Sequence, residues 1–210
     1  ASPPSSVPSG TCPFDYIDND SWKTTSPKLV FTYNTGESSM MYGYWTRVFK
    51  SGGYNLRNSV DLATFPDASP KADDETVETL EFGMKTDFEK GRLNWAFFNT
   101  VVDDSQRMTN IQDPVSGVAQ VVKNAGDIEY RGFEIDGVYT MTDTVTMVAS
   151  LGYVHSKYKN LISDLTGDFI IDALDYALEV PRAAPLTYSL GFNIDGNLGT
   201  WRSITRISYY

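Results

Sequence analysis

The sequence predicts an all-β protein whose strands form one antiparallel sheet. Apolar and polar residues alternate in residues 186–194, where the even positions are apolar and the odd positions are small or polar. The same alternation runs through residues 145–153 and through the shorter stretches 80–84 and 93–97. Helical spacing of apolar residues is found nowhere over a comparable length, so a mainly helical fold is excluded.

The connections between the strands alternate in length, and this places the sheet in a membrane. About eight strands are expected, near residues 28–34, 39–50, 75–88, 92–103, 127–140, 144–158, 185–195 and 200–210. Four connections are tight turns, whereas the loops 51–74, 104–126 and 159–184 run to about twenty residues each, which is uncommon in compact soluble domains. Short turns on one side and long loops on the other are typical of outer-membrane barrels. We therefore expect an antiparallel transmembrane β-barrel segment.

The expected organisation is a single partial barrel domain over residues 1–210. Residues 1–26 would lie in an extracellular loop, and residues 27–210 would form strands with short periplasmic turns and long extracellular loops. In this arrangement the first strand descends from the outside and the last strand ends there. A complete barrel of this kind begins and ends in the periplasm, so we expect an internal segment of a larger barrel.

Composition narrows the classes of partner. The formal net charge is −10, which argues against nucleic acid because a phosphate-binding surface needs clustered Lys and Arg. An acidic chain fits cationic, neutral or metal-bearing partners, and an acidic surface that serves solubility fits the charge equally well. Cys12 is the only cysteine, so neither an internal disulfide nor a cysteine-based zinc site can form, and it is expected to be unpaired.

One expected strand breaks its own alternation. Glu129 and Arg131 are at odd positions, whereas Glu134 and Asp136 are at even ones. A β-bulge at Gly132 would bring all four charges to one face. The alternative is a strand end with charges on both faces.

Several motifs, in order along the chain, resemble the barrel strands of TonB-dependent receptors. Val48 stands where the second motif usually has glycine. The segments that carry the resemblance are SPK at 26–28, YGYWTRVFKSGGYN at 42–55, ETLEFGMK at 78–85, NWAFF at 94–98, NAG at 124–126 and RGFE at 131–134. Each motif alone is weak, but their order and spacing make the resemblance strong from residue 26 to residue 210.

The resemblance implies a specific function. Such receptors are 22-stranded barrels of the bacterial outer membrane with a lumen plugged by an N-terminal domain. They bind a scarce nutrient outside the cell, which is siderophore–iron, vitamin B12, haem or a sugar, and use the TonB system to move the plug. For this chain the expected nutrient is an iron–siderophore complex. The expected partners are therefore a nutrient ligand, the plug, the TonB system and the lipid or lipopolysaccharide of the outer membrane. Neither a plug nor a TonB-contacting segment matches anything in this sequence.

Candidate ligand contacts are basic residues expected to face the lumen. They are Arg47, Lys85, Arg131, Arg202 and Arg206. These cations could guide an anionic ligand, and the alternative is that they pair with lumen carboxylates such as Glu81 and Glu134 or with the plug. The acidic loop residues are expected to be solvated, so neither a metal site nor a cofactor is predicted. They are Asp67, Asp73, Asp74, Asp164, Asp168 and Asp172.

An enzyme is not expected. The only histidine, His155, has the parity of the lipid side, and no serine lies in a G-x-S-x-G motif. Two other classes remain as alternatives. One is a small complete outer-membrane barrel that serves as an anchor or adhesin, and the other is a soluble β-sandwich binding module.

Side-chain placement separates these alternatives. Outward Tyr and Trp near strand ends should form two belts about 25 Å apart. The polar, concave face should carry the strand charges Arg47, Glu81, Lys85, Glu129, Arg131, Glu134, Asp136, Arg202 and Arg206. The convex, lipid side should carry Leu80, Phe82, Trp95, Val145, Met147, Leu151, Leu186, Tyr188, Leu190 and Phe192.

Overall fold

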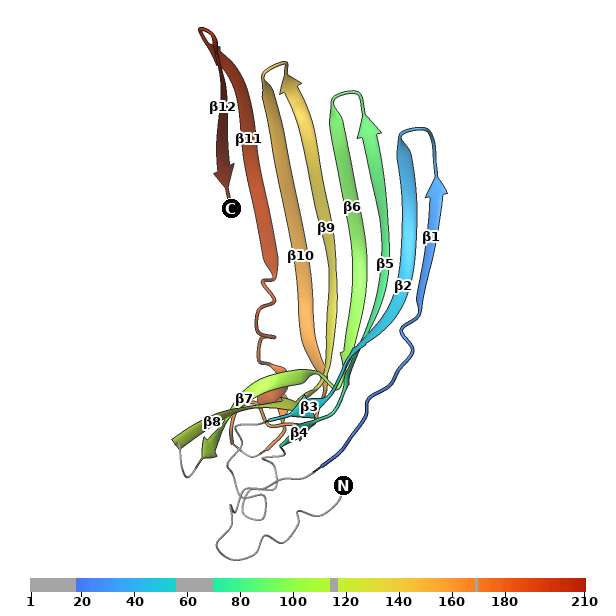
Figure 1. The fold of residues 1–210 in the computed structure, drawn as a ribbon, viewed down its shortest axis with the longest axis vertical. Helices are drawn as coiled ribbons and strands as arrows, with labels where there is room; N and C mark the ends of the chain where they lie inside the picture. Colours follow the sequence, from blue (N-terminus) through green and yellow to red (C-terminus); the bar gives the residue numbers. More distant parts are fainter. Residues whose placement is uncertain (1–17, 56–69, 114–116, 169) are drawn as a thin grey trace, which may run out of the picture.

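The computed structural model describes residues 18–55, 70–113, 117–168 and 170–210, and its main element is a curved antiparallel sheet of eight strands (Figure 1). The strand order is β1-β2-β5-β6-β9-β10-β11-β12, so each strand of this sheet pairs with the strand of the same sheet that follows it in the sequence. The strands are β1 (Lys28–Asn34), β2 (Ser39–Lys50), β5 (Glu75–Phe88), β6 (Gly91–Asp103), β9 (Gly126–Thr142), β10 (Val145–Leu161), β11 (Leu186–Leu198) and β12 (Trp201–Tyr209). All eight expected strands are confirmed.

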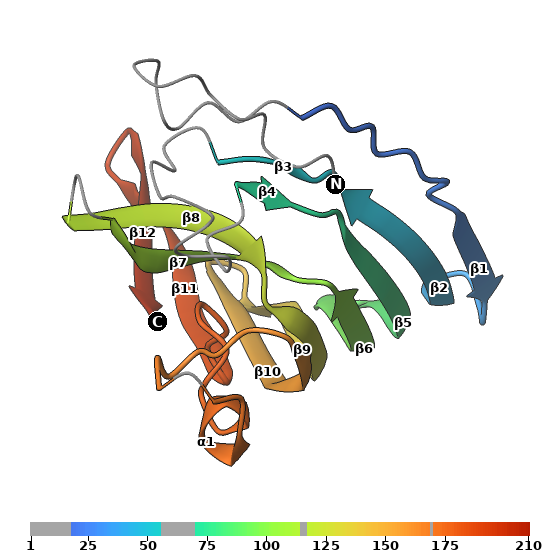
Figure 2. The same ribbon diagram turned by 90° about the horizontal axis from the view of Figure 1, so that it is seen from below.

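The long loops contain structure that the sequence pattern did not indicate. The segment expected as the loop 104–126 contains the hairpin β7 (Gln106–Asp113) and β8 (Gly117–Asn124). A second small pair, β3 (Gly53–Tyr54) and β4 (Lys71–Ala72), lies near the end of β2, and one helical turn, α1 (Ala173–Tyr176), lies between β10 and β11. These elements gather at the end of the sheet opposite the tight turns (Figures 1 and 2).

The strand register collects the large apolar side chains on one face. Residues directly opposite one another share a face, and one such row runs Phe82, Phe97, Phe133, Tyr153 and Leu186 from β5 to β11. Within it the rings of Phe97 and Phe133 lie 6.0 Å apart, and those of Phe133 and Tyr153 lie 5.9 Å apart. All ten residues expected on the lipid side have the parity of this face.

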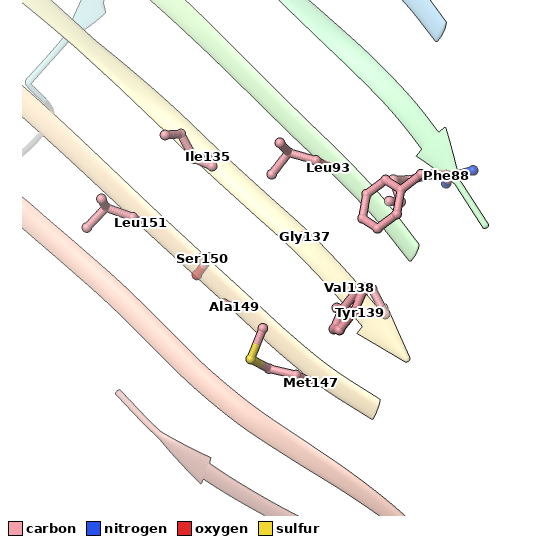
Figure 3. Close-up of a pocket in the computed structure, with 11 residues that line it drawn as sticks. Phe88, Leu93, Ile135, Gly137, Val138, Tyr139, Met147, Ala149, Ser150 and Leu151 are labelled. Carbon is pink, nitrogen blue, oxygen red and sulfur yellow. The ribbon is translucent and has the colours of Figure 1, made fainter. Parts of the chain in front are cut away.

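The apolar face is the convex one. Seen along the strands, the sheet forms an arc with the β7–β8 hairpin across its concave side (Figure 2), and Figure 1 has that hairpin in front of the sheet. When β9 is followed toward its arrowhead in Figure 1, β6 lies on its right and β10 on its left. In Figure 3 the strand with Leu93 (β6) lies on the left of β9 and the strand with Leu151 (β10) on its right. Figure 3 therefore shows the opposite, convex face. The residues that Figure 3 draws include Leu93, Ile135 and Met147 of the apolar face.

No second layer covers the apolar face in the part of the chain that the structure describes. Leu80 and Phe97 are each more than half exposed, although they lie in the middle of the long strands β5 and β6. A β-sandwich would bury these side chains between two sheets, so the structure contradicts that alternative. A small closed barrel is contradicted as well, because β1 pairs only with β2 and β12 only with β11 among the described strands.

The hairpins are staggered, and the stagger gives the strand tilt. Met41 and Tyr188 lie on one cross-strand row, yet Met41 is about four residues from its turn and Tyr188 about eleven residues from its own. This shift of about seven residues occurs over five strand-to-strand steps. With a rise of about 3.3 Å per residue and about 4.8 Å between strands, the strands tilt by about 45°. Transmembrane barrels have this tilt.

The predicted bulge at Gly132 is wrong. The pairing of β9 with β6 continues without a shift through Gly132, and its pairing with β10 shifts only near the two strand ends. A Cβ on Gly132 would lie 2.6 Å from Cζ of Phe98 and 2.2 Å from the carbonyl oxygen of Tyr153. Glycine is therefore needed because the Phe98 ring of the neighbouring strand lies over it.

Candidate functional site

The concave face carries polar residues along the middle of the wall, and one hydrogen-bonded group among them is centred on Glu81. The Tyr42 hydroxyl donates a hydrogen bond to one carboxylate oxygen at 2.8 Å, and the Tyr44 hydroxyl donates to the other at 2.9 Å. Tyr44 lies directly opposite Glu81, and the Tyr42 ring lies over Gly83, where a Cβ would come within 2.7 Å of it. The sheet therefore presents a carboxylate in a fixed orientation on the side where the lumen of a closed barrel would lie.

Lys85 lies four residues closer to the tight turns than Glu81, on the same face. Its ammonium group is 5.7 Å from the centre of the Tyr42 ring, which favours a cation–π contact. Lys85 also lines a polar hollow of about 460 Å³ together with Asn34, Asp87 and Arg92. The expected concave position of Lys85 is confirmed.

Further polar pairs continue across the concave face. The Asn94 amide donates to Asp136 at 2.9 Å, and the hydroxyls of Ser150 and Ser189 lie 2.7 Å apart. With Lys85 these side chains form one row across β5, β6, β9, β10 and β11, which we call the polar ladder.

Two arginines of the last strand also have the concave parity. Arg202 lies opposite Asn197 and donates to Asp195 at 2.9 Å, and Arg206 lies opposite Asn193. Both positions agree with the expectation. Arg202 is therefore already paired with a carboxylate of the wall, as the alternative reading of these cations had it.

The structure corrects the expected positions of Arg47, Glu129 and Arg131. The register places Arg47 opposite Glu78 and Arg131 opposite Asn99 and His155, on the convex face. Glu129 shares this face, whereas Glu134 and Asp136 have the concave parity. The physical reason is height: these three residues lie beyond the apolar rows near the loop end of their strands, where a charge no longer meets hydrocarbon.

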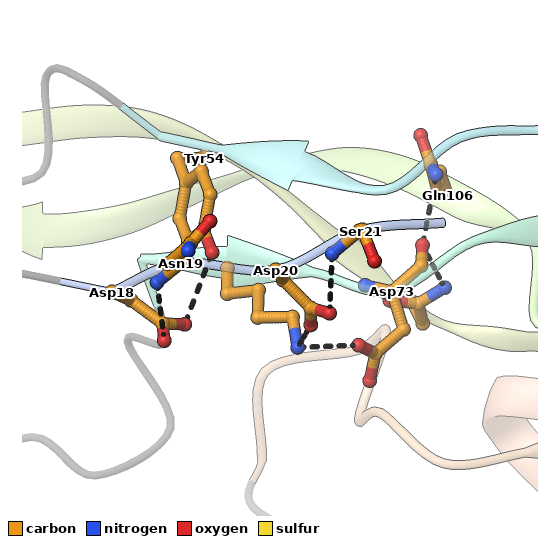
Figure 4. Close-up of polar contacts among 9 residues, drawn as sticks. Asp18, Asn19, Asp20, Ser21, Tyr54, Asp73 and Gln106 are labelled. Atoms are coloured by element: carbon orange, nitrogen blue, oxygen red, sulfur yellow. Dashed lines mark hydrogen bonds and ion pairs between the residues drawn. The ribbon is translucent and has the colours of Figure 1, made fainter. Parts of the chain in front are cut away.

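The loops at the far end of the sheet are joined by polar contacts that the sequence did not reveal (Figure 4). Lys71 forms ion pairs with Asp20 and, at 3.3 Å, with Asp73, and the Tyr54 hydroxyl donates to Asp18 at 3.1 Å. The hydrogen bond from Lys71 holds the pKa of Asp20 below its usual value, and the same bond raises the pKa of Lys71. These contacts attach the segment before β1 to the β3–β4 pair.

Asp175 organises the loop between β10 and β11. Its fully buried carboxylate accepts hydrogen bonds from the backbone N–H groups of Leu165 at 2.7 Å, Thr166 at 2.9 Å and Asp172 at 2.9 Å. Led by the bond from Asp172, these donors hold the pKa of Asp175 below its usual value, although burial opposes them. The carboxylate is thus a structural centre of this loop.

The described residues offer no group of three or more potential ligands that could hold a metal ion. Asp164 accepts hydrogen bonds from Thr166 and Gly167, as in a tight polar turn. His155 lies on the convex face, as its parity predicted. Cys12 and Asp67 lie outside the described residues. Among the helices described, none has the length and apolar character to cross a membrane.

The convex face contains a shallow apolar hollow of about 410 Å³ (Figure 3). Gly137 and Ala149 form its floor because they are small and lie directly opposite each other. Leu93, Tyr139 and Met147 surround them. A hollow with this mainly apolar lining fits a hydrocarbon chain.

A tilted antiparallel sheet with an exposed apolar convex face, a polar concave face, tight turns at one end and long loops at the other is a section of a membrane β-barrel wall. The family model for TonB dependent receptor-like β-barrels matches residues 4–210. The chain therefore belongs to the TonB-dependent receptor β-barrel family, whose members are transport receptors of the outer membrane.

Solved structures with the same fold include three receptors and transporters. The ferric yersiniabactin uptake receptor FyuA from Yersinia pestis is 17% identical with a TM-score of 0.65, and 86% of this chain covers 24% of it. The copper transporter OprC is 18% identical with a TM-score of 0.59, and 86% of this chain covers 25% of it. The siderophore receptor PiuA from Acinetobacter baumannii is 20% identical with a TM-score of 0.53, and 80% of this chain covers 23% of it. The chain thus spans about a quarter of each structure.

The tyrosine pair around Glu81 was not among the predicted site residues. The sequence does indicate that Tyr42 and Tyr44 share one face of β2, because only Gly43 separates them. The missing information was the register that brings Tyr44 opposite Glu81 in β5. Alternation gives the face of a side chain but not its cross-strand partner.

Proposed function

We propose that this chain forms part of the wall of a 22-stranded receptor that imports an iron–siderophore complex across the outer membrane. The observation that carries the proposal is the concave face, where Glu81, Lys85, Arg202 and Arg206 lie on the lumen side of a membrane-embedded sheet. Siderophore receptors among the structures of the same fold support this substrate class.

The concave residues divide into two roles in this proposal. Glu81, held by two tyrosine hydroxyls, is a fixed acceptor for donors of the plug domain. Arg206 and Lys85 lack a carboxylate within ion-pair distance in the described part of the chain, so they are the cations available to an anionic ligand or to the plug. The TonB system would act through the plug and not through this wall.

The test measures uptake in cells that produce the full-length receptor as their only candidate importer. Labelled ferric siderophores, haem and cobalamin are offered separately under iron limitation. The variant Lys85→Gln/Arg206→Gln should keep the receptor assembled while lowering uptake of one ferric siderophore severalfold. The matched control is Arg47→Gln, which removes a cation from the opposite face. Failure to import any ferric siderophore, or equal loss of uptake in the control, would overturn the proposal.

A further inference from the structure

The loops at the far end of the sheet hold one ammonium group from three sides. The Lys71 Nζ forms an ion pair with Asp20, in the segment before β1, and another at 3.3 Å with Asp73, just after β4 (Figure 4). The same nitrogen lies 5.8 Å from the centre of the Trp22 ring, whose face attracts a cation. We call Asp20, Trp22 and Asp73 the ammonium cage.

The aromatic wall of the ammonium cage is held in place without the help of Lys71. The Trp22 ring lies over Gly52, where a Cβ would overlap the indole. The Trp22 and Tyr54 ring centres are 6.0 Å apart, and the Tyr54 hydroxyl donates to Asp18 at 3.1 Å, two residues before Asp20. Strand β3 therefore fixes both the ring and the chain on either side of Asp20, so the cage should persist when Lys71 leaves it.

The ammonium cage is shielded on one side and open on the other. The side chains of Lys71 and Asp20 are 25% and 35% exposed, whereas that of Asp73 is 72% exposed. A second ammonium group can therefore approach along Asp73 without unfolding a strand. Lysine carries its charge on a flexible four-carbon stem, so Lys71 can move out into water as the other group enters. Two carboxylates face one cation, so the occupied cage keeps a negative charge.

We propose that the ammonium cage binds a primary alkylammonium group of an external ligand, and that Lys71 occupies it as an internal substitute until such a group displaces it. Carboxylates accept charge-assisted hydrogen bonds from an ammonium group, and the Trp22 face adds a cation–π contact. Because Lys71 is tethered, it competes at a high effective concentration. The site therefore selects ligands that contact the loops at more than one point. The proposal does not require the imported nutrient to be a siderophore complex.

The test uses the full-length receptor in detergent micelles and two probes. The first is n-butylammonium, which copies the stem and head of lysine, and the second is n-butanol, which lacks the charge. Lys71→Ala empties the ammonium cage and should bind n-butylammonium saturably in calorimetry, at least tenfold more tightly than n-butanol. The wild-type receptor should need at least a tenfold higher concentration, because Lys71 competes. Hydrogen exchange in residues 18–22 should be faster in Lys71→Ala and should slow again when n-butylammonium is added.

The matched control is Lys23→Ala, which removes an exposed lysine beside Trp22 and should behave as the wild type does. Adding Asp20→Asn to Lys71→Ala removes one wall of the cage and should weaken n-butylammonium at least tenfold. If Lys71→Ala fails to assemble, Lys71→Met keeps the apolar stem and is tested with methylammonium. Equal affinity for the uncharged probe, equal binding by the wild type and the emptied cage, or unchanged binding after Asp20→Asn would overturn the proposal. Nutrient uptake has no part in the readout, so the outcome is independent of the import test.

Discussion

At the level of single residues, glycines decide where large aromatic rings can lie against the concave face. Gly83 lies beneath Tyr42 and Gly132 beneath Phe98, both across a strand pair. In each place the ring of one strand covers backbone of the next. The Tyr42 hydroxyl can therefore reach Glu81 only because residue 83 has no side chain.

Gly132→Ala should destabilise the wall by about 1–3 kcal/mol, because its Cβ would meet both Phe98 and a backbone carbonyl. The thermal unfolding midpoint of the purified full-length receptor measures the effect. The control is Gly36→Ala, since a Cβ on Gly36 would meet nothing within 4 Å. An unchanged midpoint for the Gly132 variant would mean that the Phe98 ring moves aside without cost.

Asp175→Asn should loosen the loop between β10 and β11 at neutral pH, because a neutral amide replaces the charged acceptor of three backbone N–H groups. Limited proteolysis of this loop at pH 7 should be faster in the variant. The folded-state pKa of Asp175 is lowered, so the carboxylate stabilises the loop above its unfolded pKa of about 3.9 and loses this effect as the pH falls through the folded value. The two proteins should therefore converge in strongly acidic buffer. A difference that persists there would argue against the charge as the cause.

Among the elements, the sheet strands were predictable and the loop strands were not. Within the bilayer each side chain faces either hydrocarbon or the lumen, so apolar and polar residues must alternate along a strand. This alternation in residues 186–194 predicts β11. Beyond the bilayer this constraint ends. The β7–β8 hairpin has polar residues on both faces, and Arg47 and Arg131 occupy the lipid parity without penalty. Alternation therefore assigned Lys85 correctly, whereas the expectation that all strand charges face the lumen, with the bulge at Gly132 that it required, assigned Arg131 wrongly.

Asn55→Ala should release the β7–β8 hairpin from its support. The Asn55 side chain donates to the Val122 carbonyl at 2.7 Å and accepts from the Val122 N–H at 2.8 Å, as a strand neighbour would. Hydrogen exchange should accelerate in residues 117–124. Exchange in β9 and β10 of the same protein is the internal control and should stay slow. Uniform acceleration in both regions would show that Asn55 supports the whole wall.

For the molecule as a whole, the two faces of the wall should differ sharply in their tolerance of charge. Leu151→Arg places a cation on the convex face about seven residues from the turn and should cost roughly 2–4 kcal/mol. Ser150→Arg places the same side chain one residue away on the concave face and should assemble far better. The amount of heat-modifiable, folded receptor in outer-membrane fractions measures both. Equal assembly would contradict the assignment of the faces.

The heights of the aromatic residues on the convex face also test whether this face meets the lipid. Tyr33 and Trp201 lie within about three residues of their turns, whereas Tyr153 and Tyr188 lie about nine and eleven residues away. Two groups at different heights are what two interfacial belts require, and their separation of about 25 Å stays a prediction. Depth-dependent quenching of Trp201 fluorescence by brominated lipids should place it at the inner interface.

Because the hairpins are staggered, a cross-strand row on the lumen side lies at a different distance from the turns in each strand. The polar ladder of Lys85, Asn94, Asp136, Ser150 and Ser189 follows one cross-strand row, and such a row lies far from the turns at β11 but near them at β5. The polar ladder therefore runs obliquely across the concave face. A solute that exchanged hydrogen bonds from Ser189 toward Lys85 would come closer to the turn end of the sheet with each strand that it crossed.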